Sequence, residues 1–209
     1  MPPVVNWEPL FRLLGSGEIF LVVGRPRRRS LVHWPLVVDE WRSALPSLVN
    51  SPLAVMVAFD LTVHLPGGAE YYLVWDIQAA QKLVMTYRIA EEYLPVAQLY
   101  SIARAYEANS DGLALPGPIL VANTPIFGPP ITLIDGNHRV IAAYQENAGQ
   151  YIPVCMLPED VMLQGMAAEA FRTFYRWHRS VQQWLELETR DAEPLVVPIP
   201  KRFQHPSFR

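Results

Sequence analysis

The sequence predicts an α/β (α+β) fold, because segments with strand character alternate with segments of helical periodicity. An apolar run that ends at Asp135 passes through a short polar loop into helix-forming residues. Two further apolar runs flank Pro66-Gly67-Gly68, as the strands of a hairpin flank their turn. We expect one domain over residues 1–190 with its core at about 76–157, and a proline-rich tail over 191–209.

Composition and charge favour a soluble globular protein. The chain of 209 residues is 51% hydrophobic and 18% charged, and its net charge of −3 argues against coating nucleic acid by charge alone. The N-terminus lacks the basic-then-apolar order of a signal peptide, and the apolar run at 53–59 is too short to span a bilayer. The single Cys155 excludes an internal disulfide. We therefore expect a cytoplasmic protein with no membrane insertion.

The N-terminal half predicts a short helix, two strands, a second helix and the hairpin. Apolar residues from Trp7 to Leu14 have helical spacing, and apolar segments at 18–23 and 31–38 suggest strands. The loop between these strands, Arg25-Pro-Arg-Arg-Arg29, is read either as a nucleic-acid contact or as a solvated hairpin tip. A helix at 39–48 follows, and then strands at 53–65 and 71–75.

The second half predicts two helices, a strand–loop–helix–strand block and a long final helix. Asp76 is suited to cap a helix that reaches about Tyr93, and a second helix covers 96–109. Strands at 115–122, 132–135 and 148–157 enclose the loop and its helix. The last helix, 159–188, has an apolar seam that docks on the domain or forms a dimer interface. Arg172, Arg176 and Arg179 form a basic stripe, which contacts DNA or a protein partner, or is a solvated face.

The loop Asp135-Gly136-Asn137-His138-Arg139 carries the candidate chemistry, although an ordinary turn has the same appearance. The N–H groups of a helix start, a glycine that permits close approach and an arginine together suit a phosphate. Asp135 would repel phosphate unless a divalent cation lies between them, so we expect it to bind Mg²⁺ or position water. His138 is expected to donate to phosphate or act as an acid or base; otherwise it caps the helix.

Residues 95–157 resemble the ParB/sulfiredoxin superfamily. Pro116 and Ile119 match its Pro-x-x-Ile strand, Gly136 and Arg139 its Gly-x-x-Arg loop, and Ile152-Pro153-Val154 its final strand. The resemblance implies nucleotide binding by Gly136, Asn137, His138 and Arg139, with Asp135, His138 and Arg139 as the catalytic group. By the same resemblance Arg104 is a further phosphate ligand; otherwise it is an exposed helix arginine.

Departures from the family pattern narrow the expected activity. Asn137 stands where sulfiredoxins have their reactive cysteine, so we do not expect sulfinic acid repair. The second arginine of the CTP-using ParB loop is missing, and the chain is most similar to plasmid fertility-inhibition proteins of the FiwA and Osa kind, which implies ATP. The resemblance thus implies an ATPase with metal-dependent DNase activity that inhibits conjugative DNA transfer. Two alternatives stay open: a non-catalytic protein that binds a DNA-transfer or secretion component, and a ParB-like DNA-binding or partition factor.

Overall fold

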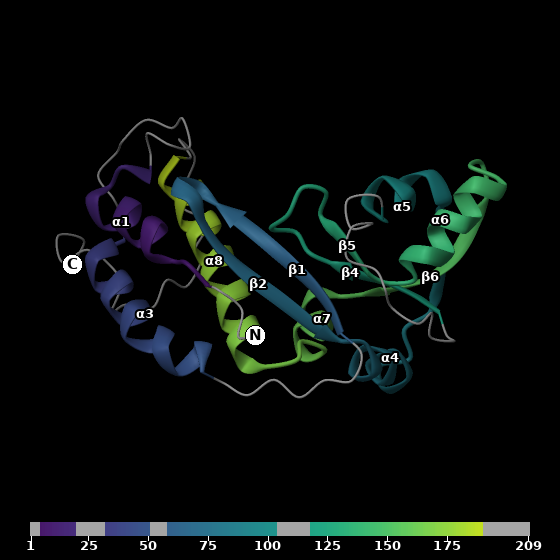
Figure 1. Ribbon diagram of the computed structural model, residues 1–209, viewed down its shortest axis with the longest axis horizontal. Helices are drawn as coiled ribbons and strands as arrows, with labels where there is room; N and C mark the ends of the chain where they lie inside the picture. Colours follow the sequence, from purple (N-terminus) through teal and green to yellow (C-terminus); the bar gives the residue numbers. More distant parts are fainter. Residues whose placement is uncertain (1–4, 20–31, 51–57, 104–117, 190–209) are drawn as a thin grey trace. The chain divides into compact units, whose positions relative to one another are not determined.

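The computed structural model describes residues 5–19, 32–50, 58–103 and 118–189 (Figure 1). Helices combine with a two-stranded sheet and a mixed four-stranded sheet, which confirms the predicted α/β class. The chain divides into two compact units. The first comprises Met1–Pro52, Leu61–Leu73 and Ala168–Arg209, and the second Leu53–Asp60 and Val74–Ala167. The core expected at about 76–157 therefore falls within the second unit.

A four-stranded sheet in the order β3-β6-β4-β5 forms the centre of the second unit. Its strands are β3 (Glu91–Pro95), β4 (Ile119–Asn123), β5 (Ile131–Asp135) and β6 (Tyr151–Leu157). β4 runs parallel to β6, whereas β3–β6 and β4–β5 are antiparallel pairs. The parallel pair arises because α6 (Asn137–Glu146) returns the chain from β5 to β6.

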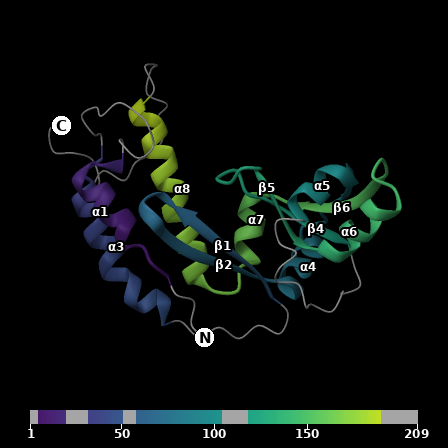
Figure 2. The ribbon, with the colours of Figure 1, turned by 45° about the horizontal axis from the view of Figure 1, so that its top comes forward.

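Side chains on the two faces of this sheet alternate, and both faces are buried near β4. Ile119, Val121 and Leu133 pack on one face with residues of α5 (Val96–Ala103) and α6. Figure 2 shows these two helices side by side. Leu120 and Ala122 alternate with Ile119 and Val121 along β4, so their side chains point to the other face, where they are fully buried. The helix α7 (Glu159–Gln164) contacts β4. Both faces of β4 are thus covered by packed side chains.

Two predicted helices of the second half are wrong in extent. The helix that Asp76 caps, through a 3.0 Å bond from the Ala79 N–H, is α4 (Ile77–Thr86), and it ends before Arg88, whose φ is 51°. Residues 91–95, expected in that helix, form β3 because their backbone pairs with β6. Hydrogen bonds to Tyr151–Cys155, a segment distant in the sequence, here override the local helical pattern.

The final helix expected at 159–188 is two helices, α7 and α8 (Glu169–Thr189). Between them the backbone turns to β2 (Ala69–Asp76): the Gly165 carbonyl accepts from Asp76, and the Ala167 N–H donates to Val74 over 2.8 Å. These bonds replace the intrahelical ones that a continuous helix would require. One sequence boundary between the two units, at Ala167, falls in this break.

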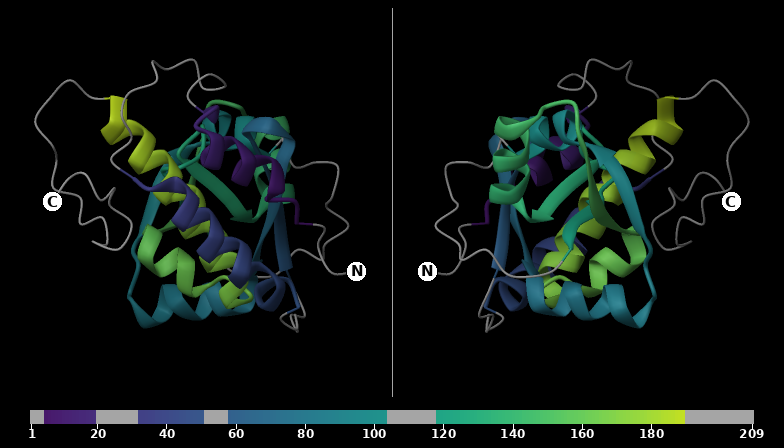
Figure 3. Two further views of the ribbon diagram at one scale, coloured as in Figure 1. Left: turned by 90° about the vertical axis from the view of Figure 1, so that its left-hand side faces the viewer. Right: turned by 90° about the vertical axis from the view of Figure 1, so that its right-hand side faces the viewer.

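The first unit contains α1 (Glu8–Ser16), α3 (Trp34–Val49) and α8, with part of the hairpin formed by β1 (Ala58–Leu65), η1 (Pro66–Gly68) and β2. Figure 3 shows α3 beside α8. Trp177 of α8 stacks on Trp41 with ring centroids 4.9 Å apart, and Trp184 meets Trp34 edge-on. The apolar seam of α8 is therefore buried within this unit, as one of its two sequence interpretations requires.

Of the two strands predicted in the N-terminal region, one is wrong and most of the other lies outside the described residues. The apolar segment at 31–38 is wrong as a strand from Trp34 onward, because it begins α3 with Pro35 in the first turn. Most of the segment at 18–23, the arginine loop at 25–29, Arg104 and the tail at 191–209 lie outside the described residues. Within the described ranges, no helix is both long and apolar enough to cross a membrane.

Candidate functional site

The turn from β5 into α6 has a backbone conformation that strongly favours glycine. Gly136 is the N-cap of α6 with φ 95° and ψ 16°, a backbone conformation that L side chains rarely adopt. A Cβ at this position would lie 2.8 Å from Cγ1 of Ile119 and 3.1 Å from Nη2 of Arg139. The glycine therefore brings the start of α6 close against the first residue of β4.

No side chain caps the first turn of α6. The Gly136 carbonyl accepts the first helical bond from the Val140 N–H over 2.9 Å, but the N–H groups at the helix start have no carbonyl one turn earlier to bind. Together with the helix dipole, such N–H groups favour an anion. The side-chain oxygen Oδ1 of Asn137 is also buried without a hydrogen-bond partner. An amide oxygen accepts hydrogen bonds, so this atom suits a donor and not the anion itself.

Asp135 and Arg139 form a partly buried ion pair across this turn. Nη2 of Arg139 lies 3.1 Å from Oδ2 of Asp135 and also donates to the Pro118 carbonyl over 3.3 Å. Burial raises the pKa of Asp135, while the Arg139 charge, the Gly136 N–H and the Gln81 amide act to lower it. Burial outweighs these partners, since the net direction is upward. The neighbouring groups thus offset only part of the cost of burying the charged Asp135 carboxylate. Such incomplete compensation occurs at functional sites and also in structural ion pairs.

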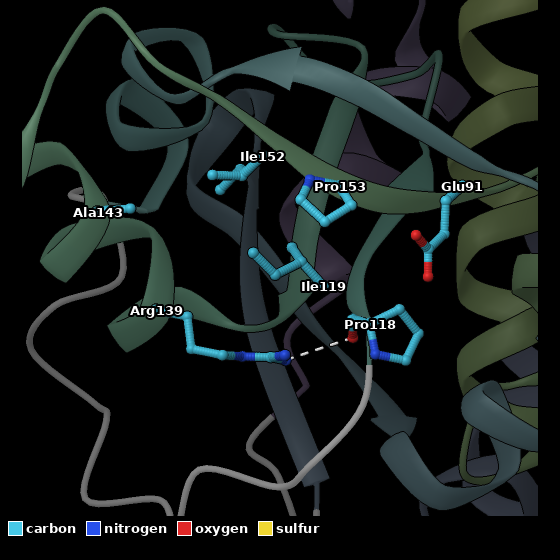
Figure 4. A pocket seen from close by; sticks show the side chains of 7 residues that line it. All are labelled: Glu91, Pro118, Ile119, Arg139, Ala143, Ile152 and Pro153. Atoms are coloured by element: carbon cyan, nitrogen blue, oxygen red, sulfur yellow. Dashed lines mark hydrogen bonds between the residues drawn. The ribbon is translucent and has the colours of Figure 1, made fainter.

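A cavity of about 530 Å³ opens beside this pair (Figure 4). Its lining residues come from β3, the start of β4, α6 and β6: Glu91, Pro118, Ile119, Arg139, Ala143, Ile152 and Pro153. The cavity lies where β4 begins, because Ile119 pairs with Val154 and leaves the preceding residues of β6 without a β4 neighbour. Its walls are mainly apolar, with Arg139 and Glu91 as the charged groups, a composition suited to an organic anion.

The structure brings together some of the residues that the sequence singled out. Asp135, Gly136, Asn137 and Arg139 meet at the start of α6. His138 belongs to the same turn, but its side chain is exposed and does not line the cavity. Arg104 lies outside the described residues. In the described ranges, no three His, Cys, Asp or Glu side chains are grouped as a metal site would need.

Glu91 and Gln81 are residues that the sequence interpretation missed. The pattern placed both in one long helix, whereas Glu91 belongs to β3 and reaches the cavity. Gln81, on α4, lies close enough to Asp135 to act to lower its pKa. The strand character of residues 91–95 has no strong local signal, so only the pairing with β6 reveals the role of Glu91.

The basic stripe on α8 is partly neutralised within its own helix. Arg172 and Arg176 both donate to Glu169, each over 2.9 Å. Arg176 remains exposed and Arg179 is partly buried. An anionic partner would therefore compete with Glu169 for two of the three guanidinium groups.

Gly136 and Arg139 lie at the junction of β5 and α6. The resemblance of this loop to the ParB/sulfiredoxin superfamily stays a prediction. Comparisons of the chain with protein-family models, with curated proteins and with solved structures find no match.

Proposed function

We propose that this protein binds the phosphate groups of a nucleotide, with ATP as the preferred ligand, at the start of α6. The observation that carries the proposal is the uncapped first turn of α6 behind Gly136, with Arg139 on the wall of the adjoining cavity. N–H groups of the turn supply directional donors, and Arg139 supplies a charge-assisted contact. The preference for ATP over CTP rests on the family resemblance, because the second arginine of the CTP-using loop is absent.

Binding of a phosphate would change the partners of Arg139. Its Nη2 donates to Asp135 and to the Pro118 carbonyl. A guanidinium has five N–H donors in a planar fork, so it can add a phosphate or turn from Asp135 toward it. If it turns away, Asp135 becomes a carboxylate without its cation. A Mg²⁺ ion bound with the nucleotide fits this position, because such ions commonly use only one or two carboxylates besides the phosphates.

Hydrolysis of ATP, with metal-dependent DNA cleavage as a further activity, is the enzymatic part of the proposal. Mg²⁺ would supply charge neutralisation to the phosphates, while Asp135 positions it or a water molecule. His138, exposed at the second position of α6, is the acid or base available in the same turn. A role in plasmid biology, as an inhibitor of conjugative DNA transfer, extends the proposal by resemblance.

Isothermal titration with ATP and CTP in magnesium tests the proposal. Arg139→Ala removes one charge-assisted contact of roughly 1.5–3 kcal/mol, so ATP affinity should fall about ten- to a hundredfold. Lys82→Ala is the matched control, because it removes an exposed cation of the same unit that does not line the cavity. Parent and control should bind ATP alike. Absence of ATP binding by the parent refutes the nucleotide proposal.

A second variant separates ligand binding from stability. Arg139→Ala alone leaves the buried Asp135 carboxylate without its ion-pair partner, which can destabilise the loop. Asp135→Asn combined with Arg139→Ala removes both charges and retains a side chain of similar shape. We expect the double variant to regain stability relative to Arg139→Ala while ATP binding stays weak. Recovery of ATP binding in the double variant would show that Arg139 acts only by holding Asp135.

The alternative function is a non-catalytic interaction protein that keeps this fold. The Asp135–Arg139 ion pair favours it, because each of the two charges has a partner within the protein. Phosphate release from ATP by purified protein distinguishes the two. The catalytic proposal expects release that Asp135→Asn and Arg139→Ala abolish, whereas the alternative expects no release above the level of a heat-inactivated sample.

A further inference from the structure

The cavity has one charged group of each sign, and they come from different strands and helices. Arg139 extends from α6 to the Pro118 carbonyl, and Glu91 enters from β3 (Figure 4). In this view Pro118 lies between the Arg139 guanidinium and the Glu91 carboxylate, and Ile119 and Pro153 lie above them. A ligand that fills the cavity therefore meets a cation, an apolar surface and a carboxylate in turn.

Strand register sets the distance between the backbone of Glu91 and that of β4. Glu91 pairs with Cys155 of β6, and Cys155 pairs in turn with Leu120 of β4. Glu91 is thus two strands away from the start of β4, or roughly 10 Å between backbones at about 4.8 Å per strand. Arg139 is bound at the β4 side of this gap, through Pro118.

The Glu91 carboxylate has hydrogen-bonding capacity to spare. It makes no hydrogen bond or ion pair with another residue in the described part of the chain. Its charge acts on the Cys155 thiol, whose pKa is raised first by burial and second by Glu91. A carboxylate accepts hydrogen bonds and donates none. Beside a phosphate it would be repulsive, but beside hydroxyl or amino groups it would be attractive.

We propose that Glu91 recognises the nucleoside part of the ligand by accepting a hydrogen bond from a ribose hydroxyl or from the exocyclic amine of the base. This inference rests on the proposed function, since it takes the phosphates to lie at Arg139. The apolar side chains between the two charges then face the sugar or the base. The cavity so arranged selects a whole nucleotide over inorganic phosphate, because only a nucleotide reaches both charges.

Titrations of the full chain in magnesium with ATP and with tripolyphosphate test the placement of Glu91. Glu91→Ala should weaken ATP binding about tenfold or more and leave tripolyphosphate binding unchanged. Glu92→Ala is the matched control: it is the adjacent exposed carboxylate of β3, on the opposite face, and does not line the cavity. Tighter binding of both ligands by Glu91→Gln would place the carboxylate beside the phosphates and overturn the inference.

Two analogues identify the donor. Inosine triphosphate lacks the exocyclic amine, and 2′,3′-dideoxy-ATP lacks both ribose hydroxyls. The effect of Glu91→Ala should disappear with whichever analogue lacks the recognised group. An equal effect on ATP and on both analogues overturns the inference. If the parent binds ATP and Arg139→Ala weakens binding but Glu91→Ala does not, only this inference fails; if the parent binds no ATP, the proposed function fails with it.

Discussion

Substitution of Gly136 by alanine should damage the candidate site by two separable effects. The backbone at Gly136 has φ 95°, where a residue with a Cβ is strained by about 1–2 kcal/mol. The added Cβ would also lie 2.8 Å from Cγ1 of Ile119, and overpacking of this kind typically costs about 1–3 kcal/mol. The free energy of unfolding of the second unit should therefore fall by roughly 2–5 kcal/mol.

The assay must report on the second unit. Of the six tryptophans only Trp75 belongs to it, so tryptophan fluorescence follows mainly the first unit. Hydrogen exchange at the paired amides of β4 and β5 during urea titration reports directly on the strands beside Gly136. Gly149→Ala is the matched control, because its Cβ would meet no atom closer than Oδ1 of Asn147 at 3.5 Å. The control should change stability by no more than about 1 kcal/mol.

Measuring Gly136→Ala in the Ile119→Ala variant tests how much of the destabilisation comes from the contact with Ile119. In Ile119→Ala the two γ carbons that crowd position 136 are absent, so Gly136→Ala should cost less there than in the parent. The cost that remains comes from the backbone strain and from the contact with Nη2 of Arg139, the end of a flexible side chain. If Gly136→Ala and Gly149→Ala cost the same, position 136 does not hold the left-handed turn. The close approach of α6 to β4, on which the phosphate site depends, would then be refuted.

Three further predictions concern other parts of the chain. Burial lowers the pKa of His178 from 6.5 to about 4, so its contribution to stability is complete above pH 6.5 and is lost as the pH falls toward 4. Urea unfolding followed by tryptophan fluorescence should show a loss on the order of 3 kcal/mol over this range, and His178→Phe should flatten the pH dependence; an unchanged pH slope in the variant contradicts the assignment. Nicking of supercoiled plasmid, if present, should require a divalent cation and disappear in Asp135→Asn; nicking that survives chelator and substitution comes from elsewhere. Replacing Arg172, Arg176 and Arg179 by Gln should preserve folding and weaken salt-dependent DNA binding, whereas unchanged affinity would make the stripe a solvated face.

Sequence patterns predicted the elements whose determinants are local. The hairpin turn at Pro66–Gly68 holds Gly67 and Gly68 at φ 78° and 81°, as glycine-based turns do. The Asp76 cap and the passage from β5 through Gly136 into α6 likewise depend on residues within one turn of each other. Such signals survive in a single sequence, because few distant contacts can overrule them.

The misplaced elements are those decided by distant backbone partners. β3 follows a helix pattern in sequence but pairs with β6, and the break between α7 and α8 is made by hydrogen bonds to β2. These errors explain why the sequence predicted only one side of the candidate site. The phosphate side, from Asp135 to Arg139, is contiguous in the chain, whereas Glu91 reaches the cavity only through the β3–β6–β4 register.

The Asp135–Arg139 pair differs physically from the pair that Arg172 forms with Glu169. Both join residues one helical turn or less apart, but the Glu169 side chain is 59% exposed, and water screens its contribution to a few tenths of a kcal/mol. The Asp135 side chain is only 15% exposed, and burial raises its pKa even with Arg139 in place. A pair of this kind is maintained at a cost in desolvation that its Coulombic attraction does not fully offset. A cation or a hydrogen-bond donor that approaches Asp135 therefore gains more binding free energy than it would at Glu169 on the surface of α8. For this reason the start of α6 is the stronger candidate for the functional site.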